Sequence, residues 1–261
     1  MSLIALLPAV RDVALAAGAV VLRHYAQRAN AETKADGSPV TAADREAEAL
    51  IVPVLRRLLP GVPVVAEEAA AVGDLPEVAA GGRFWLVDPL DGTREFISRN
   101  GEFTVNIALI EDGRPVLGVV LAPVLGDLYA GAEGNGAVLS RVGMPDRVIA
   151  ARLPPPDGWI AVGSRSHSAR DAENAFLAGF PLVERRACGS SLKFCLIAEG
   201  AADIYPRFGP TCEWDTAAGH AVLAAAGGRI RLVEGELVEG GPLLYGKLGF
   251  RNPHFIAFGR S

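Results

Sequence analysis

The sequence predicts an α+β protein made of two halves that differ in the order of their strands and helices. In the first half, two helical patterns precede apolar strands joined by tight turns, which is typical of an antiparallel sheet. In the second half, strand and helix patterns alternate, which favours an α/β arrangement. The proline-rich segment LPPPDG at 153–158 separates the two patterns. We therefore expect one unit at 1–153 and a second at 154–261.

The segment 1–27 is predicted to be an amphipathic helix. Arg11 and Asp12 interrupt its apolar run before it reaches the roughly 20 residues that a membrane span needs, so we expect no transmembrane segment. The apolar residues recur at three- and four-residue steps, as one buried helical face would. These residues are Ile4, Leu7, Val10, Ala14, Ala17 and Val21.

The other expected elements follow in chain order. After a polar loop at 30–40, Thr41 should cap a second helix that carries Asp44 near its N-terminus. Strands at 62–66 and 83–88 come next, then a hairpin about Asp112-Gly113 and a meander that continues through Asn135-Gly136. Beyond 158, we expect strands at 159–164, 181–187 and 202–206 and helices at 168–179, 190–200 and 214–228.

Composition and charge exclude several classes of function. Half of the 261 residues are hydrophobic and 21% are charged, which supplies a buried core and argues against disorder. The formal net charge is −5 and the 25 basic residues are scattered, so we expect no nucleic-acid-binding groove. These observations are compatible with binding of a small charged ligand. The three cysteines lack disulfide or zinc spacing, which favours a reducing cytoplasm.

Carboxylates are concentrated at strand ends and helix starts. Glu67-Glu68 follow one predicted strand, DPLDGT at 88–93 follows the next, and Asp215 begins a predicted helix. In DPLDGT, proline and glycine restrict the turn, so that Asp88, Asp91 and the Leu90 carbonyl can face one point. Hard cations such as Mg²⁺ prefer such oxygen ligands. Each motif alone can be explained as an ordinary turn or helix cap. The prediction of a metal site therefore depends on the occurrence of all of them in one chain.

Three motifs resemble the inositol monophosphatase superfamily of metal-dependent, lithium-sensitive phosphatases. They are AEE at 66–68, WLVDPLDGTREF at 85–96 and WDTAAGHAVLAAAGG at 214–228, and they occur in family order. Other segments, among them GSRSH at 163–167 and GSSLK at 189–193, look most like the 3'(2'),5'-bisphosphate nucleotidases of that superfamily. The resemblance runs from about Lys34 to Gly228 and implies a layered αβαβα sandwich.

The resemblance implies a role for particular residues. Two or three Mg²⁺ ions per site would be held by Glu67, Asp88, the Leu90 carbonyl, Asp91 and Asp215. Asp44 and Thr93 would orient and deprotonate the attacking water, in an in-line displacement at phosphorus. The positions that would contact the phosphorylated substrate are Gly92, Thr93, Ser164, His167, Gly189, Lys193, Arg207 and Asp215.

The resemblance also implies an activity. The substrate would be a small phosphorylated nucleotide, adenosine 3',5'-bisphosphate, cleaved to AMP and phosphate, with 3'-phosphoadenylyl sulfate as a further substrate and a link to sulfate assimilation. An inositol monophosphatase or fructose-1,6-bisphosphatase of broader specificity is the first alternative. The second alternative is a non-catalytic protein that senses phosphate or a cation. The sequence does not determine whether the protein forms a homodimer, whether it lies at the inner membrane face, or whether residues 69–82 form a lid.

Overall fold

The protein is described by a computed structural model that covers residues 2–27, 31–33, 39–164, 170–234 and 238–260. Its helices are α1 (Leu3–Gln27), α2 (Ala42–Leu58), α3 (Glu67–Ala71), α4 (Thr93–Ser98), α5 (Arg170–Leu177), α6 (Leu192–Ala198), α7 (Ala217–Ala225) and the 3₁₀ turn η1 (Leu248–Phe250). Its strands are β1 (Ala31–Thr33), β2 (Pro39–Thr41), β3 (Val64–Ala66), β4 (Phe84–Asp91), β5 (Thr104–Glu111), β6 (Arg114–Ala122), β7 (Asp127–Ala132), β8 (Gly136–Arg141), β9 (Arg147–Ile149), β10 (Trp159–Gly163), β11 (Leu182–Ala187), β12 (Ile204–Arg207), β13 (Arg229–Glu234), β14 (Val238–Pro242) and β15 (Phe255–Phe258).

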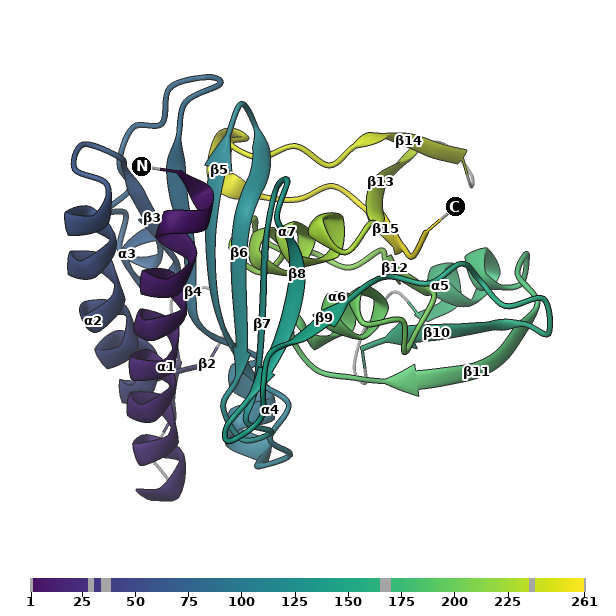
Figure 1. The fold of residues 1–261 in the computed structure, drawn as a ribbon, viewed down its shortest axis with the longest axis horizontal. Helices are drawn as coiled ribbons and strands as arrows, with labels where there is room; N and C mark the ends of the chain where they lie inside the picture. The colour runs from purple at the N-terminus through teal and green to yellow at the C-terminus, as the bar shows by residue number, and fades with distance from the viewer. Residues whose placement is uncertain (1, 28–30, 34–38, 165–169, 235–237, 261) are drawn as a thin grey trace.

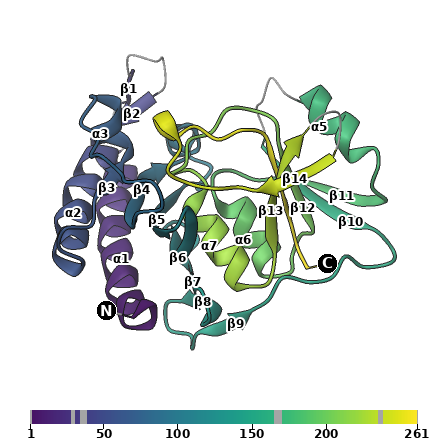
Figure 2. The same cartoon turned by 90° about the horizontal axis from the view of Figure 1, so that it is seen from above.

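The elements form five layers. Helices α1 and α2 cover the outer face of a first sheet with the order β3-β4-β5-β6-β7-β8-β9 (Figure 1). Helices α6 and α7 lie between this sheet and a second one, ordered β11-β10-β12-β15-β13-β14, and α5 packs on the far side of the second sheet (Figure 2). Three hydrophobic clusters fill the four spaces between layers, and one of them surrounds α6 and α7 on both sides. The expected α+β fold, a layered αβαβα sandwich, is confirmed by this arrangement and by structural neighbours reported below.

Two glycines allow α7 to lie close against the first sheet. A Cβ atom on Gly118 of β6 would lie 2.4 Å from the Ala218 carbonyl oxygen, and one on Gly131 of β7 would lie 3.0 Å from the Cα of Val222. Neither position therefore tolerates a side chain without a shift of the helix. Because Asp215 lies two residues before the start of α7, this close packing also holds Asp215 near the end of β4.

Helix α1 has the length and the apolar composition of a membrane span, since its hydropathy average over 18 residues is 1.9. Half of that window is buried inside the protein. Leu6, Val10, Ala14, Ala17 and Val21 are fully buried in the cluster between α1, α2 and the first sheet. The apolar character of α1 is therefore explained by its role in the core.

Several local predictions were wrong or incomplete. Ile4 was expected on the buried face of α1, but it is 59% exposed, because the buried face at the start of the helix is made by Leu3, Leu6 and Leu7 and Ile4 points to its solvent side. The expected polar loop at 30–40 contains the antiparallel pair β1–β2. The second sheet is mixed, since only β11, β10 and β12 run parallel and β15, β13 and β14 are antiparallel.

Two boundaries also differ, and both concern the acidic residues. The strand expected to end at Asp88 continues to Asp91, with a register shift against β5 between these two positions. The helix expected from Trp214 begins at Ala217, after Thr216 as N-cap, so Asp215 lies in the turn that precedes it. Both differences place the carboxylates in irregular backbone, where side chains that a regular element would separate can converge.

Candidate active site

Strand β4 carries three of the predicted metal ligands, the carboxylates of Asp88 and Asp91 and the Leu90 carbonyl. Asp88 is opposite Asn106 of β5 and Asp91 is opposite Thr104, so two residues of β4 bulge out against one of β5. Residues three apart on a regular strand point to opposite faces, and the bulge removes this constraint. The Leu90 amide donates to Asp88 Oδ1 at 3.0 Å, which turns the intervening peptide back toward the carboxylate. Asp88 is 1% exposed.

Glu67 and Asp215 join Asp88 and Asp91 from other parts of the chain. Parallel pairing of β3 with β4 brings Glu67, the first residue of α3, beside the end of β4. Glu67 lies close enough to Asp88 to raise the pKa of that carboxyl group. Burial raises the pKa of Asp88 well above its usual range, and repulsion from Glu67, Asp91 and Asp215 raises it further. The structure thus places these four carboxyl groups within electrostatic reach of one another.

Asp91 and Asp215 are each held by hydrogen-bond donors as well as repelled by their neighbours. Burial raises the pKa of Asp91, while Lys193, Asn106 and Ser191 oppose this rise. The Ser191 amide donates to Asp91 Oδ2 at 2.7 Å. Burial and the carboxylates of Asp91 and Glu67 raise the pKa of Asp215 well above its ordinary value, although the Cys212 amide donates to Asp215 Oδ2 at 2.8 Å.

The donor set fits a hard divalent cation. Four acidic side chains and the Leu90 carbonyl offer oxygen atoms only, and their mutual repulsion is the condition that a bound cation relieves. Among the described residues, no three acidic, His or Cys side chains are already arranged as ligands around a common point. The fit to a cation therefore rests on the oxygen chemistry of the donor set and on the proximity of the carboxylates to one another.

Asp44 and Thr93 lie together at the starts of two helices. Asp44 is 1% exposed and forms a capping box with Thr41, whose amide and hydroxyl both donate to Asp44 Oδ2. Its other oxygen, Oδ1, lies 3.4 Å from Thr93 Oγ1. Gly92 precedes Thr93 in the left-handed region, with φ of 90°, and lets the chain turn from β4 into α4. One Asp44 oxygen thus caps α2 while the other faces Thr93.

A cavity of about 130 Å³ adjoins the acidic residues. The predicted substrate-contacting positions that line it are Gly92, Ser164, Gly189, Lys193 and Arg207, together with Asp91 and Asp215. Thr93 and the remaining ligand candidates Glu67, Asp88 and Leu90 do not line it. His167 lies outside the described residues. The cavity therefore connects one edge of the acidic group with the two buried cationic side chains, Lys193 and Arg207, and exposed Arg94 lines it as well.

The two cationic side chains are buried and oriented by the protein. Lys193 is 4% exposed and its Nζ donates to the carbonyls of Cys188 and Ser190, at 3.2 and 2.6 Å. Arg207 is 8% exposed and donates to Ser164 Oγ and to the Pro210 carbonyl, both at 3.0 Å. Buried cations held in this way are suited to bind an anionic group of a ligand.

Sequence reasoning missed three residues that support the site. Asn106 Nδ2 donates to Asp91 Oδ2 at 3.3 Å and to Ser191 Oγ at 3.0 Å, and Ser191 Oγ in turn donates to the Asp215 carbonyl at 2.7 Å. Glu48 accepts hydrogen bonds from the amides of Glu68 and Ala69, at 2.8 and 2.9 Å. Two of these residues could have been found from the sequence. Asn106 is the one polar residue in an otherwise apolar strand segment, VNIALI, and Glu48 lies one helical turn after Asp44 on the same face of the helix.

Glu48 caps α3 from a neighbouring helix, and we expect it to control the position of Glu67. The N-cap residue of α3 is Ala66, which has no side-chain acceptor, and Glu48 supplies the acceptor instead. Glu48→Gln places an amide group against these backbone donors and should raise the Mg²⁺ concentration for half-maximal thermal stabilisation about tenfold, as outer-shell changes at metal sites do. A thermal-shift titration with MgCl₂ measures this. Glu46→Gln, on the exposed side of the same helix, is the matched control, and equal titrations for both variants would contradict the assignment.

The fold and the acidic site together define a class of protein. The inositol monophosphatase family model matches residues 5–254, and the chain belongs to this family. The family fold implies dependence on a divalent metal. Among curated relatives, the "3'(2'),5'-bisphosphate nucleotidase CysQ" of Escherichia coli O157:H7 is 46% identical over 253 residues, covering 96% of this chain and 98% of that protein. The protein of the same name from E. coli strain K12 is 49% identical over 224 residues, covering 85% and 86%.

Solved structures agree with this assignment. The crystal structure of CysQ from Bacteroides thetaiotaomicron, described as a bacterial member of the inositol monophosphatase family, has a TM-score of 0.76 and 40% identity, covering 97% of this chain and 96% of that one. The inositol monophosphatase from Anabaena sp. PCC 7120 has a TM-score of 0.77 at 28% identity, covering 100% and 93%. The family and the fold are therefore shown, and the relatives with the higher identity carry the nucleotidase name.

Proposed function

We propose that the protein is a 3'(2'),5'-bisphosphate nucleotidase, which hydrolyses the 3'-phosphate of adenosine 3',5'-bisphosphate to give AMP and phosphate. The observation that carries this proposal is a single cavity lined both by two of the acidic residues and by buried Lys193 and Arg207. A substrate with two phosphates fits such a cavity, because one phosphate can lie at the acidic end with its cations while the other meets the basic side chains. Relatives at 46–49% identity that bear the nucleotidase name support it.

The residues around the acidic group have distinct proposed roles. Asp88, Asp91, Glu67, Asp215 and the Leu90 carbonyl would hold Mg²⁺, with two or three ions per site. Cations held there would supply Lewis-acid activation of water and neutralise charge on the transferred phosphate. This occupancy and the identity of the metal are part of the proposal.

Asp44 and Thr93 are proposed to position and deprotonate the attacking water. The Thr93 hydroxyl lies 3.4 Å both from Asp44 Oδ1 and from the Leu90 carbonyl, so it can give its proton to one acceptor and receive one from water. Asp44 is buried and fixed by Thr41, which keeps Oδ1 directed at Thr93. Water attacks phosphorus, the bond from phosphorus to the 3'-oxygen breaks, and the leaving oxygen takes up a proton.

Substrate contacts are proposed at one edge of the cavity. Gly92 and Thr93 would offer backbone amides to the reacting phosphate. Ser164, Gly189, Lys193 and Arg207 would contact the nucleoside and its second phosphate. His167, which lies outside the described residues, belongs to the same proposal through its motif. The family resemblance supports four further parts of this proposal, namely action on 3'-phosphoadenylyl sulfate, a role in sulfate assimilation, inhibition by lithium and a cytoplasmic location.

Phosphate release from two substrates tests the proposed function. Adenosine 3',5'-bisphosphate and inositol 1-phosphate are compared at equal concentration, each with Mg²⁺ and with EDTA. We expect Mg²⁺-dependent release from the nucleotide and much slower release from the inositol ester. A preference for inositol 1-phosphate would retain the phosphatase chemistry and overturn the substrate. Release from neither of them, with Mg²⁺ still raising Tm, would favour a sensor.

Arg207 provides a sharper test of the substrate. If its guanidinium binds the second phosphate, Arg207→Gln should raise KM for adenosine 3',5'-bisphosphate about tenfold or more, because hydrogen bonds to charged groups contribute about 1.5–3 kcal/mol. The same variant should change KM for 3'-AMP, which has one phosphate, by less than about twofold. Arg185→Gln, on the exposed edge strand β11, is the control. Equal effects on both substrates would place Arg207 away from the second phosphate.

A further inference from the structure

A second and larger cavity, of about 610 Å³, lies along α7 away from the acidic group. It is bounded by the start of β6, the turn between β7 and β8, the middle of α7 and the start of β13. Its lining has no residue in common with the cavity described above. The proposed phosphatase chemistry therefore does not account for this cavity.

The walls of the larger cavity are basic. Arg114, Arg229 and Arg231 line it, against one carboxylate, Glu133, although the whole chain has a net charge of −5. Arg229 is held over the ring of Phe258, 4.8 Å from its centroid. In the part of the chain that the structure describes, neither Arg114 nor half-buried Arg231 has a side-chain hydrogen bond or ion pair. Two guanidinium groups at one cavity thus have their donors available to a ligand.

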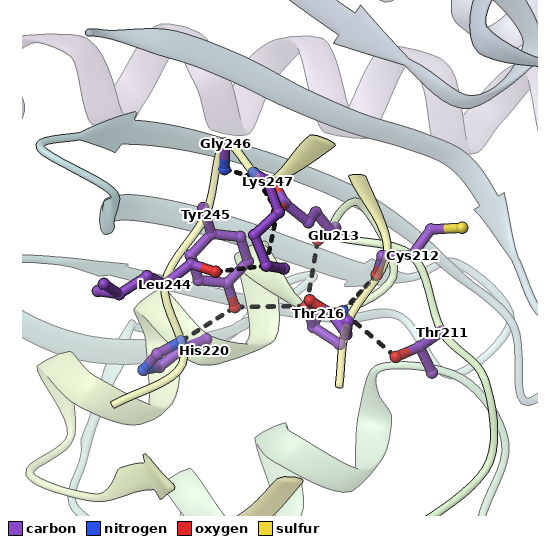
Figure 3. A network of polar contacts seen from close by, with 10 residues as sticks. Thr211, Cys212, Glu213, Thr216, His220, Leu244, Tyr245, Gly246 and Lys247 are labelled. Atoms are coloured by element: carbon purple, nitrogen blue, oxygen red, sulfur yellow. Dashed lines mark hydrogen bonds and ion pairs between the residues drawn. The ribbon is translucent and has the colours of Figure 1, made fainter. Parts of the chain in front are cut away.

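His220 adds a hydrogen-bond acceptor to the same wall. His220 is 8% exposed and lines the cavity, and its Nδ1 lies 3.0 Å from the Tyr245 hydroxyl (Figure 3). In Figure 3 the other ring nitrogen points away from this network. Burial lowers the pKa of His220 to about 3, so the ring is neutral at pH 7 and one nitrogen has no proton.

The network determines which nitrogen is without a proton. Thr216 Oγ1 donates to the Glu213 carbonyl at 3.2 Å, since a carbonyl can only accept. Thr216 must therefore accept from Tyr245, whose hydroxyl lies 3.3 Å away, and Tyr245 uses its only proton there. The Tyr245 oxygen then accepts from His220 Nδ1, which leaves His220 Nε2 as an acceptor. A ligand in the cavity that approaches His220 must bring an O–H or N–H donor.

We propose that this cavity is a binding site for a small phosphate-bearing molecule that also carries a hydrogen-bond donor, with hydrogen phosphate as the simplest member of the class. Arg114 and Arg231 would bind the anionic oxygens, and His220 Nε2 would accept the O–H. Sulfate carries the same charge and shape but no proton at neutral pH, so the site should favour phosphate over sulfate. The inference is independent of the proposed activity, because binding here involves no turnover.

Calorimetric titration of the Mg²⁺-loaded protein with inorganic phosphate tests the site. We expect a binding event that is weakened about tenfold or more in the double variant Arg114→Gln/Arg231→Gln and unchanged in Arg57→Gln, a control on the exposed face of α2. Because the double variant leaves the acidic site intact, any phosphate bound there remains as a separate event. Identical isotherms for the wild type and the double variant would overturn the proposal.

Two further measurements test the role of His220 and the location of the ligand. The wild-type event should be at least about tenfold weaker with sulfate than with phosphate, and His220→Phe should remove this preference. If His220→Phe does not fold, the sulfate comparison on the wild type decides the point. Crystals soaked in arsenate, which also carries an O–H, should show anomalous density beside Arg231. Equal binding of sulfate and phosphate, or no density in this cavity, would contradict the proposal.

Discussion

Asp88→Asn should abolish phosphate release and, in EDTA, raise the Tm of the protein. Asp88 is fully buried, and its pKa is raised by burial and by Glu67, Asp91 and Asp215. Asn keeps an acceptor for the Leu90 amide and offers a donor to Glu67, while it removes one of the repelling charges. A loss of about 10³-fold in kcat is expected, since the proposed cations supply several kcal/mol. In EDTA, relief of repulsion by about 1 kcal/mol should raise Tm by roughly 3 °C.

The effect on stability should depend on pH in a definite direction. A carboxyl group whose pKa is higher in the folded than in the unfolded protein binds its proton more tightly in the folded state. Its favourable contribution is present at low pH and is lost as pH rises through the raised pKa. The stability gained by Asp88→Asn in EDTA should therefore be small at pH 5 and larger at pH 8.

Mg²⁺ should reverse the order of the two proteins. It should raise the Tm of the wild type and leave that of Asp88→Asn nearly unchanged, because the ligand set is incomplete. Asp146→Asn, which removes a carboxylate from a surface ion pair with Arg11, is the control and should keep the Mg²⁺ response. A full Mg²⁺ response in Asp88→Asn would show that Asp88 is not a ligand. Scanning calorimetry in EDTA and in Mg²⁺ measures all of these differences.

Thr93→Val should lower kcat by about 10²–10³-fold while the Mg²⁺-induced rise in Tm persists. Val has nearly the shape of Thr but cannot bridge Asp44 Oδ1 and the Leu90 carbonyl, each 3.4 Å from the Thr93 hydroxyl. The metal ligands proposed above do not include the Thr93 side chain, so cation binding should be retained. Steady-state kinetics with the nucleotide and a parallel thermal-shift assay measure the two effects.

Thr93→Ser is the matched control for this prediction. It keeps the hydroxyl at the first residue of α4 and should retain most of the activity. If Thr93→Val and Thr93→Ser were equally active, the hydroxyl would have no part in the reaction. If Thr93→Val lost both activity and the Mg²⁺ response, Thr93 would have to be assigned to the metal site.

The larger features of the fold could be predicted from local patterns. Periodicity in 1–27 predicted α1, Thr41 predicted the start of α2, and the Asp-Gly and Asn-Gly turns predicted the β5–β6 and β7–β8 hairpins. These signals are local, since capping and turn formation depend on residues within one or two turns of each other. The division at 153/154 stays a prediction. The core between the two sheets combines Val120 of the first half with Phe194 of the second.

The candidate residues could be read from the sequence because the DPLDGT, AEE and WDTAAG motifs occur together, but their contacts could not. Three of these contacts join residues that are 15 to 100 positions apart in the sequence. They are the hydrogen bond by which Glu48 caps α3 and the two hydrogen bonds that Asp91 accepts from Asn106 and Ser191. No local pattern records such pairings, because they depend on which strands become neighbours. His220 shows the same limit, since no local pattern places its ring at a cavity that Arg114 and Arg231 also line.

The sequence by itself determined the composition of the core, most helices and hairpins, and the set of oxygen ligands proposed for the metal. Only the tertiary structure decided that Glu67, Asp88, Asp91 and Asp215 lie within electrostatic reach of one another, and that Lys193 and Arg207 line a cavity beside them. The physical reason is that burial and repulsion act between side chains that meet through sheet pairing and helix packing. The energies of such contacts depend on distance in space, which the order of residues along the chain does not contain.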